Sequence, residues 1–258
     1  MSRIAVVLLA GLALVTCAHV GRVGPAPSEG VSVLYLVPSD KVERPGMTER
    51  LKHALVTVQA WTAQQADGGT FLIAEPVVTV VKTGHPSAWY GQSAGEADAK
   101  GLFQNRVVTD GFEAVEGSYS QPRMLWLMYI DADPPCGSVY GGAYVPGGAG
   151  AAVLPANDLR GLEAEPTIDT CTHKPEPKSP VCRWVGGLGH ELGHALGVPH
   201  PHGYDTREPW GDEHDLMWSG FTWFPETHWN EQALERLGKN PLFGAMPVLS
   251  PGASCSGR

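Results

Sequence analysis

Three histidines and one glutamate stand in a short segment of the chain at spacings that suit a catalytic metal site. The segment reads His190-Glu-Leu-Gly-His-Ala-Leu-Gly-Val-Pro-His200, which is the pattern H-E-x-x-H-x-x-G-x-x-H. Residues four apart lie on one face of an α-helix, so His190 and His194 can present ring nitrogens to one zinc ion. Glu191 projects beside them, where it can serve as general base toward a zinc-activated water without binding the metal itself.

A turn after this helix is expected to supply the third ligand. The helix must end near Gly197, because glycine adopts the left-handed conformation most readily. Pro199 then favours an extended chain that runs back past the helix end. His202 competes for the same role, but it lies two residues further on and would need a shift of the backbone. We therefore predict three zinc ligands, with the fourth position open for water: His190, His194 and His200.

The segment resembles the signature of the metzincins, a family of zinc metallopeptidases. These enzymes also carry a Met-turn below the zinc, for which Met217 in Asp215-Leu-Met-Trp218 is the candidate. The resemblance implies an α+β, zincin-like fold with a twisted mixed sheet, an active-site helix and a smaller C-terminal subdomain. It also implies that a peptide lies against the edge strand of the sheet, which we place at residues 140–145 or 148–154.

The function implied by the resemblance is zinc-dependent hydrolysis of peptide bonds by a metalloendopeptidase. Some metzincins place a tyrosine two residues after the Met-turn methionine, but this chain has Ser219 there. A tyrosine-assisted transition state is therefore not carried over, and the resemblance points to an unclassified bacterial subfamily. Two alternatives stay open: a non-catalytic zinc-binding surface lipoprotein that engages a partner, and a zinc amidase that acts on cell-wall peptides.

Weaker candidate ligands follow the histidine segment. Secondary metal ligands or a calcium site would draw on these residues: His202, His214, His228, Asp205, Asp212, Glu213 and Asp215. Ordinary histidines and a solvated acidic loop are the favoured interpretation, since the acidic spacing fits no calcium loop. The aromatic residues after the Met-turn form either a pocket wall for the residue after the cleaved bond or a plain core: Trp218, Phe221, Trp223, Phe224 and Trp229.

The elements that position these residues follow from hydrophobic periodicity. Residues 31–37, 71–73, 77–81 and 125–130 are predicted strands, and 136–155 a Gly-rich strand or strand pair with a turn at 147–148. A helix capped by Thr48 is predicted to run to about residue 66. Residues 183–197 and 227–237 form further predicted helices, and 166–181 a Pro-rich loop. The region 84–120 shows no pattern that assigns it.

Composition sets the broad class. The 258 residues are 43% apolar, which suits one full-sized core. The net charge is −9, and no cluster of Lys and Arg is present, which argues against a nucleic-acid partner. A peptide or protein substrate is the expected partner.

The N-terminal residues are typical of export. Residues 4–15 are apolar but too short to span a bilayer, as in a signal peptide. We expect a signal over 1–17, a flexible tether over 18–30 and a metallopeptidase domain over 31–258. Leu14-Val-Thr-Cys17 resembles a lipobox, which would make Cys17 the only membrane anchor, while cleavage after Ala18 remains the alternative. The expected location is therefore secreted, or lipid-anchored at the bacterial cell surface or outer membrane.

Cysteine usage agrees with export. Without Cys17, four cysteines remain, and an even number in an oxidising compartment suggests two disulfides. We expect the pairs Cys171–Cys182, which closes a short Pro-rich loop, and Cys136–Cys255, which ties down the C-terminus.

Overall fold

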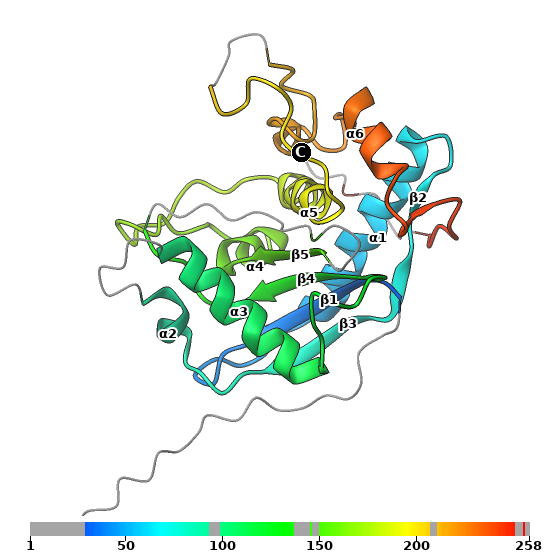
Figure 1. Ribbon diagram of the computed structural model, residues 1–258. Coiled ribbons are helices and arrows are strands. Elements are labelled where there is room, and N and C mark those ends of the chain that lie inside the picture. The colour runs from blue at the N-terminus through cyan, green and yellow to red at the C-terminus, as the bar shows by residue number, and fades with distance from the viewer. Residues whose placement is uncertain are drawn as a thin grey trace, which may run out of the picture.

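A four-stranded sheet forms the centre of the molecule. The computed structural model describes residues 29–92, 99–136, 145, 150–206, 211–250 and 255. The strand order is β3-β1-β4-β5, and every pair in it is parallel. The strands are β1 (Gly30–Val37), β3 (Ile73–Lys82), β4 (Met124–Ile130) and β5 (Gly150–Leu154), which lies at the edge of the described sheet (Figure 1).

Both faces of this sheet are covered, as the continuous apolar runs in its central strands require. Side chains alternate between the faces along a strand. In β1, Val33 and Tyr35 therefore enter one core, while Leu34 and Leu36 enter the other. All seven residues of β4 are buried for the same reason.

Helices pack on each face of the sheet (Figure 1). On one face lie α2 (Ser87–Gly91) and α3 (Ala99–Val115), which bury Tyr90, Phe103 and Val107. On the other face lie α1 (Met47–Gln65), α4 (Ala156–Leu162) and α5 (Val181–Ala195). No helix among the described residues has the length and apolarity needed to cross a membrane.

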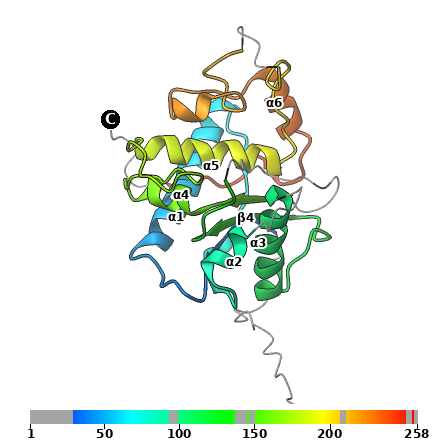
Figure 2. The same ribbon diagram turned by 90° about the vertical axis from the view of Figure 1, so that its left-hand side faces the viewer.

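The C-terminal segment covers the side of α5 that faces away from the sheet. It holds the 3₁₀ turn η1 (Gly220–Thr222) and α6 (Glu231–Leu237). Figure 2 shows α5 running across the middle, with the sheet below it and this segment above. The segment returns to the main body through a short antiparallel pair between β2 (Thr70–Phe71) and β6 (Phe243–Gly244).

The predicted strands at 31–37, 77–81 and 125–130 are confirmed, as is the helix that carries the histidine motif. Two details of the helices differ. Helix α1 starts at Met47 after Gly46, and the Thr48 hydroxyl bonds to Glu43 instead of capping the helix. The last helix starts at Glu231, four residues later than predicted, because the Asn230 side chain accepts the Ala233 N–H and caps it there.

The unassigned region 84–120 contains α2 and α3. Of the two expected edge strands, 148–154 overlaps β5, whereas 140–145 lies outside the described residues apart from Val145. The predicted turn at 147–148, residues 1–28 and therefore the signal region with Cys17 also lie outside them.

The predicted disulfide pairing is wrong. Cys136 is bonded to Cys171, which links the loop after β4 to the Pro-rich loop before α5. Cys182 is a buried thiol in the first turn of α5, and its side chain makes a hydrogen bond with that of Cys255. The short spacing between Cys171 and Cys182 was misleading, because the Pro-rich loop carries the first cysteine away from the helix that carries the second.

Candidate metal centre and its pocket

Helix α5 ends in a backbone turn that brings the third histidine back to the first two. Gly197 has φ 91°, the left-handed conformation that glycine tolerates. Its N–H donates to the His194 carbonyl at 2.9 Å, and the Val198 N–H donates to the Gly193 carbonyl at 2.9 Å. This pair of bonds is the Schellman arrangement, which reverses the chain at a helix end.

The three histidines meet through their Nε2 atoms. The Nε2 atom of His194 lies 3.2 Å from that of His190 and 3.0 Å from that of His200, and the remaining pair is 3.3 Å apart. Nitrogens bound at about 2.05 Å in a tetrahedral zinc site stand roughly 3.3 Å apart. Within the described part of the chain, these three residues are the only cluster of His, Cys, Asp and Glu with the spacing of a metal site.

Backbone carbonyls set the orientation of two of these rings. The Nδ1 atom of His190 donates to the Leu216 carbonyl at 2.8 Å, and that of His194 donates to the Val198 carbonyl at 2.9 Å. Each bond fixes the tautomer that leaves Nε2 unprotonated and free to bind a metal. Tyr204 stacks on the third ring, that of His200, at a centroid distance of 3.6 Å.

Burial keeps the three rings neutral. It lowers the pKa of His190 to about 3, with a further contribution from neighbouring His194. Burial also lowers the pKa of His194, and it lowers that of His200 to about 4. Neutral imidazole is the form that binds zinc, and three convergent imidazole nitrogens fit that ion well.

The segment with Met217 forms the floor of this site. The Asp215 carboxylate accepts the Met217 N–H at 2.9 Å and a second hydrogen bond from the Asn230 amide. The Leu216 N–H donates to the His228 carbonyl at 2.8 Å, so the chain on both sides of the turn is tied down. Met217 is fully buried and packs against α5 at Gly193.

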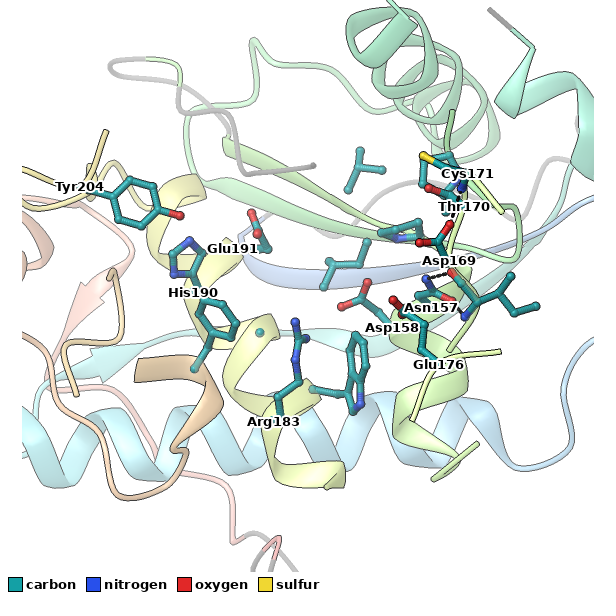
Figure 3. A pocket seen from close by; sticks show the side chains of 18 residues that line it. Asn157, Asp158, Asp169, Thr170, Cys171, Glu176, Arg183, His190, Glu191 and Tyr204 are labelled. Atoms are coloured by element: carbon teal, nitrogen blue, oxygen red, sulfur yellow. Dashed lines mark hydrogen bonds between the residues drawn. The ribbon is translucent and has the colours of Figure 1, made fainter. Parts of the chain in front are cut away.

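A pocket of about 420 Å³ opens beside the histidines. Figure 3 shows Glu191 rising from α5 beside His190 at one end of this pocket, with Arg183 and Asp158 further along it. Val153 and Leu154 of β5 also line it, so the pocket joins the metal centre to the edge of the described sheet.

Electrostatic shifts in the pocket arise mainly from burial. Burial raises the pKa of Asp158 to about 6, although the nearby Arg183 guanidinium opposes the shift. Burial also lowers the pKa of Arg183, against the attraction of Asp158, Glu191 and Glu176. The guanidinium nevertheless stays charged at neutral pH.

The solved structures of other proteins include similar folds. Wild-type OgpA from Akkermansia muciniphila is 20% identical, with a TM-score of 0.51 over 88% of this chain and 65% of that chain. This likeness shows that the chain shares the fold of that protein. The zincin-like fold class predicted above is therefore confirmed, and the chain spans 65% of the length of the OgpA chain that it matches.

Two other similar structures have lower scores. Archaemetzincin from Methanopyrus kandleri is 19% identical, covering 84% of this chain and 97% of that chain at a TM-score of 0.39. Metalloproteinase-II from Bacteroides fragilis is 15% identical, covering 84% of this chain and 55% of that chain at a TM-score of 0.38. No protein-family model matches the sequence, and no curated protein matches it.

The structure brings His190, His194 and His200 into one cluster and leaves the weaker candidates outside it. Glu191 lies beside His190 (Figure 3), and Met217 packs against α5 at Gly193. His202 is exposed, and His214 donates to the Glu226 carbonyl at 2.7 Å. His228 pairs with Asp212 at 3.2 Å. The Asp215 carboxylate accepts hydrogen bonds from the Met217 N–H and the Asn230 amide. Of the aromatic residues, Phe221 lines the pocket, while Phe224 and Trp229 lie in the core.

Sequence reasoning missed three polar residues of the site. Arg183 and Gly187 precede Glu191 at intervals of four, so the helical spacing already placed Arg183 on the same face. Tyr204 follows His200 by four residues in a loop, where no periodicity applies. Asp158 comes from α4, and no local pattern could have linked it to α5.

Proposed function

We propose that the chain is a zinc-dependent metalloendopeptidase of the metzincin type. His190, His194 and His200 would hold the zinc, and Glu191 would act as general base. The observation that supports this most is the convergence of three neutral Nε2 atoms next to a carboxylate, at the mouth of a pocket.

Each residue contributes a defined step to the hydrolysis. When bound, zinc supplies Lewis-acid polarisation of the scissile carbonyl and activation of water. Glu191 takes the proton of the attacking water and passes it to the leaving amine. The carbonyls of Leu216 and Val198 hold the rings of His190 and His194 in position throughout, so no ligand has to rearrange. An extended peptide would lie beside β5, whose residues Val153 and Leu154 reach the pocket.

The decisive experiment compares Glu191→Ala with wild type on a quenched-peptide library. We expect one zinc per chain in both proteins and a loss of roughly 10²–10⁴-fold or more in kcat/KM for the variant. Glu235→Ala is the matched control, since Glu235 is an exposed residue of α6 that pairs only with Lys239 among the described residues. Near-normal turnover by zinc-loaded Glu191→Ala would refute the mechanism.

The same preparation separates the rival functions. A non-catalytic zinc protein would bind one zinc yet cleave no peptide, with or without a chelator. A zinc amidase would cleave small amides or cell-wall peptides but leave unstructured peptides intact. Chelator-sensitive cleavage within ordinary peptides favours the endopeptidase over both.

We further propose that the protein is exported, either secreted or lipid-anchored through Cys17. The apolar residues 4–15 and the Cys136–Cys171 bond support this, since disulfides persist in oxidising compartments. Cys17→Ser should release a lipid-anchored protein from the membrane fraction. Wild type found in the soluble extracellular fraction would favour plain secretion, and wild type in the cytosol would refute export.

A further inference from the structure

The guanidinium of Arg183 faces the pocket beside the metal centre. Arg183, Gly187 and Glu191 line the same side of α5 at intervals of one turn. The Arg183 side chain lies over the Trp184 ring, with 3.9 Å between Cζ and the ring centroid, and is 5.1 Å from that of Phe221. These two rings fix the charge in place.

Asp158 supplies an acceptor on the opposite side of the same space. Among the described residues, no ion pair or hydrogen bond links its carboxylate to Arg183, although both border the pocket. Figure 3 shows the two side chains directed into the space between α4 and α5. A donor and an acceptor therefore face one cavity without satisfying each other.

Gly187 leaves the room between them. An ideal Cβ on Gly187 would lie 3.4 Å from Arg183 Nη1 and 3.9 Å from Asp158 Oδ1, and outside its own stretch of helix it would meet nothing else within 4 Å. The two polar atoms are therefore at most about 7 Å apart, which is within the reach of a planar carboxamide that makes one hydrogen bond of about 2.9 Å to each.

We propose that this pocket selects a carboxamide side chain, that of Gln or Asn, at one substrate position flanking the cleaved bond. The amide oxygen accepts from Arg183 and the amide nitrogen donates to Asp158. That the bound group belongs to a substrate rests on the proposed peptidase function. The choice of a carboxamide rests on the geometry of the pocket alone.

Other side chains satisfy only one of the two groups. A carboxylate pairs with Arg183 but is repelled by the negative charge of Asp158. An ammonium group pairs with Asp158 but is repelled by the positive charge of Arg183. An alkyl side chain leaves both polar groups without a partner, which such sites penalise strongly. The vicinal hydroxyls of a sugar offer the same donor and acceptor pair as the amide, so the test must include a sugar.

The test measures binding, so that it does not depend on turnover. The probes are hydroxamates that bind zinc and carry one side chain next to that group: Gln, Glu, Lys, Leu or glycosylated Ser. Calorimetry on the zinc-loaded wild-type protein at pH 7.5 should show the Gln probe binding at least 10-fold more tightly than the other four. Equal affinities, or tightest binding by the Leu or the glycosylated probe, would overturn the proposal.

Three variants then identify the residues responsible. Asp158→Asn should make the Glu probe the tightest, because only the positive partner remains charged. Arg183→Met should favour the Lys probe for the opposite reason, and Gly187→Leu should abolish the discrimination by filling the gap. An unchanged ranking in Asp158→Asn and Arg183→Met would overturn the assignment. If the Gln preference holds while no peptide is cleaved, the peptidase proposal fails and the pocket assignment stands.

Discussion

Met217 packs directly against the backbone of Gly193, between the two histidines of α5. A Cβ placed on Gly193 would lie 2.6 Å from the Met217 sulfur and 3.0 Å from Cη2 of Trp229. Real Cβ atoms essentially never approach so closely, so a larger residue at position 193 would force Met217 or the helix to shift. The floor of the metal centre therefore depends on the absence of a side chain as much as on the methionine.

Gly193→Ala should destabilise the metal-free protein. Overpacking costs about 1–3 kcal/mol, and the better helix propensity of alanine returns only about 1 kcal/mol of it. Gly187→Ala is the matched control on the same helix, because its Cβ meets only ordinary contacts of 3.4 and 3.9 Å. Urea denaturation should rank Gly187→Ala above wild type and wild type above Gly193→Ala. Equal stability of the two variants would contradict the close packing described for Met217.

The two histidines near the turn should behave differently on substitution. His200 has its Nε2 atom 3.0 Å from that of His194, while His202 is exposed and outside the cluster. His200→Ala should lose most of the zinc affinity and nearly all activity, whereas His202→Ala should keep both within a few-fold. Metal analysis after dialysis against a weak chelator measures the difference. The reverse result would identify His202, and not His200, as the third ligand.

The convergence of the three histidines was predictable from the sequence because its geometry is local. The spacing of His190 and His194 on one helix face and the left-handed Gly197 depend on residues within ten positions of each other. The strands β1 and β4 were predictable for the same reason, since a continuous apolar run of this length is typical of a buried strand.

What the sequence could not predict depends on elements that are distant in the chain. Asp158 reaches the pocket only because α4 packs against α5, and Cys136 meets Cys171 only because two loops converge. Helix α3 escaped notice because Gly101 and Gly111 weaken its propensity. The second glycine lies where α3 packs closely on the sheet, since a Cβ on Gly111 would lie 2.9 Å from the Met128 sulfur.

Peptide mapping of the oxidised protein should find two crosslinks. Cys136–Cys171 is the first. We expect Cys182–Cys255 as the second, because the two side chains already make a hydrogen bond. Mass spectrometry of a non-reduced digest, with alkylation of any free thiol, gives the pairing. A Cys171–Cys182 peptide would contradict the structure, and two free thiols at 182 and 255 would contradict the second bond.

The carboxyl group of Asp158 should make a measurable contribution to the pH dependence of the free energy of unfolding. Burial raises its pKa to about 6 in the folded protein, above the ordinary value of 3.8. The folded state thus holds the proton more tightly than the unfolded state does. The resulting stabilisation is complete below pH 3.8 and is lost as the pH rises through 6.

Asp158→Asn removes this titration, so it isolates the contribution of one group. The histidines of the metal centre have lowered pKa values and produce the opposite trend, but they are present in both proteins and cancel in the comparison. Between pH 4.5 and pH 7.5, the free energy of unfolding of metal-free wild type should fall by about 2 kcal/mol relative to that of the variant. Urea denaturation at the two pH values, with chelator present, gives both numbers. A difference that stays constant with pH would show that Asp158 titrates as an ordinary exposed carboxylate. If the free energy of unfolding of wild type instead rose with pH relative to that of the variant, Arg183 would be holding Asp158 in its charged form.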